Sequence, residues 1–219
     1  KLHDAPIYMD DTSGITITEM KAKIRRVNQD PARPNVGLIV IDYLQLMTTG
    51  QRSENRVQEI QAKRPLGAYT GKPLHFIGHL QTNKARHAVE HFALIESVDS
   101  LKLLAHLEKA AAELDKVQDV LLQINEAGEV QKSGFAPEDF RAAVPELKNY
   151  PHIRVRGVMV IAQATDHVEE TRPVFAAGYR DFLFLRDALP DIPVDILSMG
   201  MTHDYWIAVE EGANEVRVG

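Results

Sequence analysis

The stretch Leu94-Ile-Glu-Ser-Val98 and the segments after it indicate the fold. It is a short run of mostly apolar residues, typical of a buried strand. Residues 100–114 carry leucine and alanine at helical spacing on one face, which predicts an amphipathic helix. Asp119-Val-Leu-Leu-Gln-Ile-Asn125 is again strand-like. A strand, a helix and a second strand in this order predict a parallel β-α-β unit.

The same alternation extends along the chain in both directions. Strands are predicted at residues 6–10, 37–47, 74–78, 94–98, 119–125, 153–161, 196–199 and 216–218, with helices at 53–63, 83–92, 100–114, 137–147 and 169–189. Eight strands within this length predict a (β/α)8 TIM-type barrel that occupies residues 1–219 as a single domain. An open, doubly wound α/β sheet is the alternative.

Composition excludes several functional classes. The chain has 219 residues, 44% of them hydrophobic, and no cysteine, so it has neither disulfides nor thiolate chemistry. The net charge of −6 argues against a nucleic-acid partner. No apolar run approaches the roughly 20 residues of a membrane span. These features favour a cytoplasmic protein, and a first residue Lys1 in place of Met indicates a fragment or a processed product.

The end of the chain offers a candidate anion site. An apolar run ends in Ser198-Met-Gly-Met-Thr202, and a second short run ends in Arg217-Val-Gly219. Backbone N–H groups released at two strand ends, beside hydroxyl and guanidinium groups, can cradle a phosphate. On spacing alone, two ordinary turns rich in small residues are the preferred explanation.

The first quarter of the chain resembles DnaB-type replicative helicases. Pro6-Ile-Tyr-Met-Asp-Asp-Thr12 and Gly37-Leu-Ile-Val-Ile-Asp-Tyr-Leu-Gln-Leu-Met47 carry the resemblance, which covers residues 1–56 and corresponds to the Walker B region of a RecA-like fold. It implies that Asp42 matches an aspartate that helps to hold nucleotide magnesium. The chain contains no G-x-x-x-x-G-K-[ST] loop, so we expect no ATP-driven activity, and Asp42 is at most a weak metal site.

From about residue 54 onward the chain resembles the pyridoxal phosphate homeostasis proteins. The phrases Leu74-His-Phe-Ile-Gly-His-Leu-Gln-Thr-Asn-Lys84, Leu197-Ser-Met-Gly-Met201 and Val216-Arg-Val-Gly219 carry this resemblance. It implies a barrel like the N-terminal domain of alanine racemase, which carries pyridoxal phosphate without a firmly assigned catalytic activity.

The second resemblance also implies a set of cofactor contacts. It assigns the phosphate to Ser198, Gly200, Met201 and Gly219, and the pyridine nitrogen to Arg217. Asn55, His79 and Lys84 lie in phrases that approach the cofactor. The family lysine that joins the cofactor aldehyde follows the first strand, where this chain has Asp10 and Asp11. Lys84 and Lys132 are the substitutes that remain.

The two resemblances together predict a chimera, in which a helicase-like strand–helix–strand unit is grafted onto a barrel fragment of residues 57–219. The favoured function is a derivative without catalysis that binds phosphate, sulfate or pyridoxal phosphate weakly and non-covalently. One alternative is an active homeostasis protein with a substitute lysine, and another is a nucleotide-binding module. The chain is expected to be a monomer, or to self-associate if the graft leaves sheet edges uncovered.

Overall fold

The structure is a computed structural model that describes residues 17–29, 71, 73–128 and 133–218. The chain divides into two compact units, residues 1–72 with 218–219, and residues 73–217. In the first unit the structure describes the helix α1 (Ile17–Gln29). The strands predicted at 6–10 and 37–47 and the helix predicted at 53–63 lie outside the described residues.

The second unit is built on one parallel sheet of six strands. The strands are β1 (His75–Phe76), β2 (Leu94–Val98), β3 (Gln118–Ile124), β4 (Ile153–Val160), β5 (Ile196–Met201) and β6 (Glu215–Arg217). Every neighbouring pair is parallel, and the order across the sheet follows the order along the chain. An open doubly wound sheet would reverse its order at a switch point, so the described strands form part of a TIM-type barrel.

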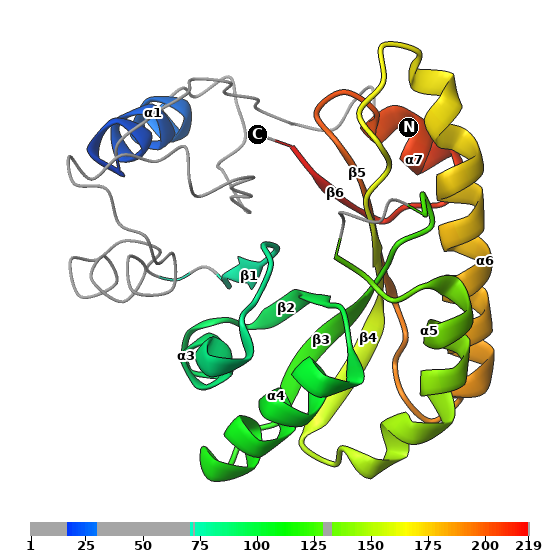
Figure 1. The fold of residues 1–219 in the computed structure, drawn as a ribbon. Helices are drawn as coiled ribbons and strands as arrows, with labels where there is room; N and C mark the ends of the chain where they lie inside the picture. Colours follow the sequence, from blue (N-terminus) through cyan, green and yellow to red (C-terminus); the bar gives the residue numbers. More distant parts are fainter. Residues whose placement is uncertain (1–16, 30–70, 72, 129–132, 219) are drawn as a thin grey trace. The chain divides into compact units, whose positions relative to one another are not determined.

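Helices connect the strands and lie outside them (Figure 1). They are α3 (Ala85–His91), α4 (Leu101–Glu113), α5 (Pro137–Ala143), α6 (Arg172–Ala188) and α7 (Tyr205–Glu210), with 3-10 turns η3 (Thr82–Lys84), η4 (Val144–Asn149) and η5 (Val168–Thr171). In α4, the Ser100 Oγ accepts a hydrogen bond of 3.3 Å from the Leu103 N–H and so caps the helix. No described helix has the length and apolar character that crossing a membrane requires.

Several predicted boundaries were wrong at the ends of elements. The strand predicted at 74–78 has only two residues, and the helix predicted at 137–147 changes to a 3-10 turn at Val144. The helix predicted at 169–189 begins as a 3-10 turn, and its α-helical part starts at Arg172. Side-chain periodicity does not distinguish these tighter turns from an α-helix, because both bury the same face over a single turn.

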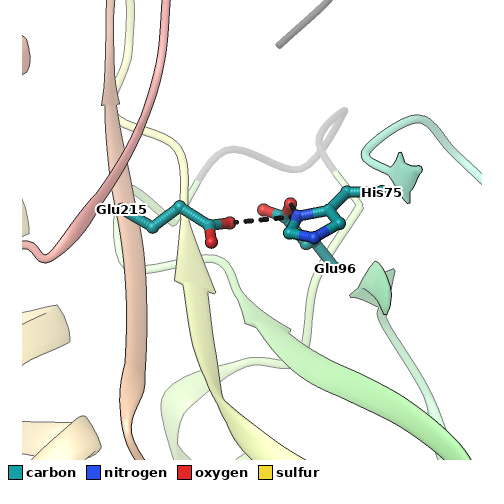
Figure 2. Close-up of side chains that lie close together, drawn as sticks. All are labelled: His75, Glu96 and Glu215. Carbon is teal, nitrogen blue, oxygen red and sulfur yellow. Dashed lines mark hydrogen bonds and ion pairs between the residues drawn. The ribbon is translucent and has the colours of Figure 1, made fainter. Parts of the chain in front are cut away.

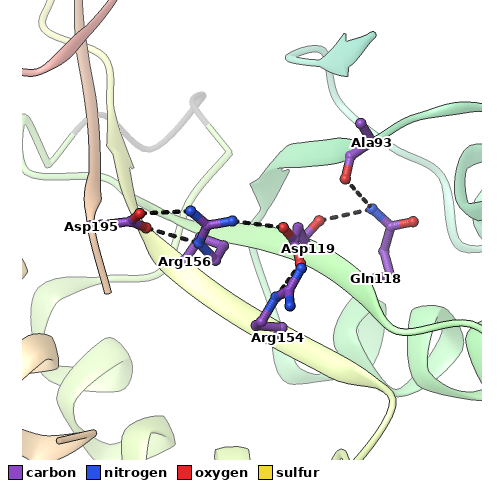
Figure 3. A network of polar contacts seen from close by, with 6 residues as sticks. All are labelled: Ala93, Gln118, Asp119, Arg154, Arg156 and Asp195. Atoms are coloured by element: carbon purple, nitrogen blue, oxygen red, sulfur yellow. Dashed lines mark hydrogen bonds and ion pairs between the residues drawn. The ribbon is translucent and has the colours of Figure 1, made fainter. Parts of the chain in front are cut away.

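The sheet carries a cluster of buried apolar side chains and, nearer the amino ends of its strands, a group of ion pairs. Leu94, Leu121 and Met159, from three adjacent strands, form a buried cluster. At the amino ends of β3 and β4, the Arg156 guanidinium donates to Asp119 at 2.9 Å and to Asp195 at 2.6 Å (Figure 3). These ion pairs, called the ionic layer below, join β3, β4 and the residue before β5. They lie at the end of the barrel that is opposite the carboxyl ends of the strands.

Candidate functional site

A buried polar group links β2, β5 and β6. The exposed fractions of Ser198, Arg217 and Glu96 are 0%, 2% and 2%. The Ser198 Oγ donates a hydrogen bond of 2.6 Å to Glu96 Oε2 and accepts one of 2.8 Å from Arg217 Nη1. Arg217 Nη2 also donates to the Val160 carbonyl at 2.9 Å. Buried charges persist only when they are paired in this way, so the group holds Arg217 in one orientation.

Sheet geometry explains why these three side chains meet. In the parallel register Ser198 is paired with Glu215, and Met201 with Arg217. Ser198 on β5 and Glu96 on β2 lie in strands three places apart in the sheet, yet their side chains are in contact. Contact across the two intervening strands, β3 and β4, requires a curved sheet with both side chains on the inner face. The curvature of the barrel therefore creates the site.

The ends of the described sheet add a second carboxylate and an imidazole (Figure 2). His75 Nδ1 on β1 lies 3.2 Å from Glu96 Oε1 on β2 and 3.6 Å from Glu215 Oε1 on β6. The side chains of His75 and Glu215 are 27% and 21% exposed, so the cluster opens toward solvent on their side. The curvature of the sheet thus brings His75 on β1 close enough to Glu215 on β6 to form an ion pair.

The electrostatics of this cluster follow from burial and proximity. Hydrogen bonds to Glu215 and Glu96 raise the pKa of His75 from 6.5 to about 9. Burial raises the pKa of Glu96 above its ordinary value. Burial also opposes the charge of Glu215, but contacts with His75 and Glu96 lower the pKa of Glu215 overall. At neutral pH, Glu215 is therefore the carboxylate that is most firmly ionised, and His75 is cationic.

The carboxyl end of β5 has the glycine that the resemblance predicts. Gly200 has a φ of +93°, and a Cβ there would lie 2.6 Å from the Ala208 Cβ and 2.8 Å from the Tyr205 Cα. Glycine is therefore required both by the backbone and by the helix α7 that packs on it. The next N–H, that of Met201, donates to Asp204 Oδ1 at 2.5 Å.

The other predicted contacts lie elsewhere. The side chain of His79 is 62% exposed, and its Nδ1 is 3.4 Å from Asp99 Oδ2 and 3.2 Å from the Ser133 Oγ. Lys84 ends η3 and is half-buried. Neither side chain takes part in the hydrogen bonds described above among Glu96, Ser198, Arg217 and the Val160 carbonyl. Asp42, Asn55, Lys132 and Gly219 fall outside the described residues.

A hollow of about 370 Å³ lies near the start of α4 and beside α5. Asp99, Asp139 and Glu146 contribute carboxylates to its wall, whereas Ser198 and Arg217 do not line it. Carboxylates repel a phosphate, so this hollow does not suit an anionic cofactor.

Known proteins resemble the chain in two regions. Residues 46–219 match the alanine racemase N-terminal domain, and residues 1–64 match the DnaB-like helicase C terminal domain. The pyridoxal phosphate homeostasis protein of Pasteurella multocida is 34% identical over 216 residues, which cover 93% of each chain. The chain belongs to the pyridoxal phosphate homeostasis family. The family member of Escherichia coli is 39% identical over 184 residues, covering 78% of this chain and 74% of that protein.

Solved structures agree with this membership. PipY of Synechococcus elongatus with pyridoxal phosphate bound has a TM-score of 0.70 at 37% identity, covering 93% of this chain and 97% of that one. Alanine racemase of Clostridium difficile has a TM-score of 0.55 at 19% identity, covering 75% of this chain and 42% of that one, which supports the fold alone. An alignment over 93% of the chain includes much of residues 1–72. The predicted chimera stays a prediction.

Sequence reasoning missed His75, Glu96 and Glu215. It looked for polar residues where apolar runs end, and these three lie within predicted strands or next to them. A signal was present, since Glu96 is a carboxylate inside a run that is otherwise suited to full burial. A charged residue at such a position needs a partner from elsewhere in the fold.

Proposed function

We propose that the chain is a pyridoxal-phosphate-binding homeostasis protein that holds the cofactor at the carboxyl ends of β5 and β6. Arg217 faces the pyridine nitrogen in this proposal, and the phosphate lies near Ser198, Gly200 and Gly219. Family membership supports the cofactor class, and PipY has been solved with that cofactor. The observation that carries the placement is the buried, doubly anchored guanidinium of Arg217.

The chemistry of Arg217 argues for carrying the cofactor and against strong catalysis. A guanidinium donates hydrogen bonds and cannot accept them, so a pyridine nitrogen beside it is favoured in its unprotonated form. An unprotonated ring withdraws electrons less strongly than a protonated one. Pyridoxal phosphate, when bound, supplies an aldehyde that reacts with amines. The arrangement around Arg217 therefore suits reversible holding of the cofactor.

Two hydrogen-bond donors near the proposed phosphate position already donate to carboxylates of this chain. The hydroxyl hydrogen of Ser198 is directed at Glu96, and the Met201 N–H is directed at Asp204. A phosphate near Ser198 would take over that hydroxyl hydrogen or would rely on other donors. We therefore expect weaker affinity than in a relative with a neutral residue in place of Glu96.

Titration of the chain of residues 1–219 with pyridoxal phosphate tests the proposal, with PipY as the positive control. We expect saturable binding at one site, followed by absorbance, and at least about 10-fold weaker binding in Arg217→Lys, because the planar two-pronged contact is lost. Arg154→Lys is the matched control, since that arginine pairs with Asp119 in the ionic layer. Binding that does not saturate, or that is equal in both variants, would contradict the proposal.

A second experiment asks whether a lysine replaces the missing one. Borohydride reduction of the loaded protein, followed by peptide mass spectrometry, locates any lysine that is joined to the cofactor. We expect label on Lys84 if the substitute-lysine form of the proposal holds, and loss of that label in Lys84→Gln but not in Lys102→Gln, an exposed residue of α4. Saturable binding without any labelled lysine would instead support non-covalent carriage.

A nucleotide-binding function is a second candidate, and the match of residues 1–64 to the DnaB-like helicase domain favours it. The missing phosphate loop argues against it. Calorimetric titration with ATP and Mg²⁺ tests whether the chain binds nucleotide, and we expect no heat of binding.

A further inference from the structure

We propose that His75, Glu96 and Glu215 form a binding site for one divalent transition-metal cation such as Zn²⁺. This inference goes beyond the proposed function and uses no property of pyridoxal phosphate. The three residues come from β1, β2 and β6, and each offers one ligand atom within 4.8 Å of the others. Figure 2 shows the three side chains converging from separate strands.

The distances suit a small cation with tetrahedral coordination. Zinc–nitrogen and zinc–oxygen bonds of about 2.0–2.2 Å place neighbouring ligand atoms about 3.3 Å apart. The separations of 3.2 Å and 3.6 Å from His75 Nδ1 to the two carboxylate oxygens lie on either side of that value. Three protein ligands and an open side toward solvent are the arrangement of zinc sites that keep a fourth position for water or a ligand.

The surroundings of Glu96 supply outer support of the kind that metal ligands have. One of its oxygens, Oε1, faces His75, while Oε2 accepts the 2.6 Å hydrogen bond from the Ser198 Oγ. Because the residue is 2% exposed, its carboxylate cannot turn out to water. A hydrogen bond that fixes the far oxygen of a ligating carboxylate orients the near one.

Charge limits the affinity and helps to define the metal. Glu96 and Glu215 favour a cation, whereas the guanidinium of Arg217, which contacts Ser198, opposes it. The metal must also displace the proton of His75, because only a neutral imidazole binds a metal. Magnesium prefers oxygen ligands and retains several waters, while imidazole suits zinc and its neighbours in the first transition row. One imidazole with two carboxylates therefore selects a transition metal over Mg²⁺.

The test uses the chain of residues 1–219, freed of cofactor and treated with chelator, and titrates it with Zn²⁺ by calorimetry. We expect one strong site per chain and affinity for Mg²⁺ at least about 10-fold weaker. His75→Gln and Glu215→Gln should each weaken Zn²⁺ binding at least about 10-fold. His152→Gln is the matched control, because His152 pairs with Glu108 at 2.7 Å and belongs to no group of three possible ligands among the described residues, and it should leave binding unchanged.

Two results would overturn the inference. If no strong Zn²⁺ site is found, His75 forms only an ion pair with the two carboxylates. If Zn²⁺ binding weakens equally in all three variants, the metal binds at scattered surface histidines. If His75→Gln does not fold, the visible spectrum of the unaltered chain loaded with Co²⁺ decides, because a tetrahedral site gives intense bands and an octahedral site gives weak ones. Pyridoxal phosphate is absent throughout, so failure here leaves the proposed function untouched.

Discussion

At the scale of single residues, the chain places ionisable groups where water cannot stabilise them. Asp181 on α6 is 1% exposed and accepts hydrogen bonds of 3.0 Å and 2.6 Å from Arg141 on α5. Glu126, in the turn after β3, lies near this pair, and its Oε1 is a buried atom without a hydrogen-bond partner. Burial and the neighbouring carboxylate of Asp181 raise the pKa of Glu126 from 4.5 to about 7.

That shift predicts a dependence of stability on pH. Because the folded chain binds the Glu126 proton more tightly than the unfolded chain does, the free energy of unfolding falls as pH rises from 4.5 to about 7. Glu126→Gln keeps a group that can donate to Asp181 and removes the titration. We expect the variant to be more stable than the parent at pH 8 by on the order of 1 kcal/mol, and little changed at pH 5. Denaturant unfolding at both pH values measures this, and an equal change at each would contradict it.

Ser198 gives a second prediction at this scale. Replacement by alanine removes the donor to the buried Glu96 and an acceptor of Arg217. We expect the free energy of unfolding to fall by about 1–3 kcal/mol, the cost of a buried polar group left without its partner. Ser133→Ala removes a hydroxyl next to the exposed His79 and serves as the control, with an expected change below about 0.5 kcal/mol. Urea titration compares the two variants, and similar losses would argue against the buried network.

At the scale of elements, the approach of β4 to β5 depends on one glycine. A Cβ at Gly157 would lie 1.7 Å from the carbonyl oxygen of Ile196, which is well inside the contact distance of any two atoms. The strands would have to separate along their paired register, where Gly157 faces Ile196. The barrel wall at this point therefore requires the absence of a side chain.

Gly157→Ala tests that requirement. We expect a loss of more than about 3 kcal/mol, or failure to fold, because backbone cannot yield as a flexible side chain does. Gly128→Ala is the control: its φ is +66° and a Cβ would have nothing within 4 Å, so only the backbone cost of about 1 kcal/mol is expected. Thermal unfolding of both proteins, followed by circular dichroism, gives the comparison. Equal destabilisation would show that β4 and β5 can part at little cost.

At the scale of the whole molecule, the described sheet ends at β1 and β6. Edges of parallel strands present unpaired N–H and C=O groups that favour association. A protein of residues 73–217 is therefore expected to self-associate as its concentration rises, while the monomer expected for residues 1–219 stays a prediction. Light scattering after size-exclusion chromatography measures both masses. A mass for residues 73–217 that stays at that of a monomer over the whole concentration range would contradict the expectation.

The sequence predicts the alternation of strands and helices, because burial period and helix caps are local properties of a chain. It predicts a strand at 94–98, the observed bounds of β2, and it offers Ser198, Gly200 and Arg217 as candidate site residues at the ends of two strands. Only the tertiary structure decided that Glu96 closes a network with Ser198 and that His75 meets Glu215 across the described sheet. Those contacts depend on the curvature of the sheet, which accumulates over several strands and leaves no periodic pattern in any one of them.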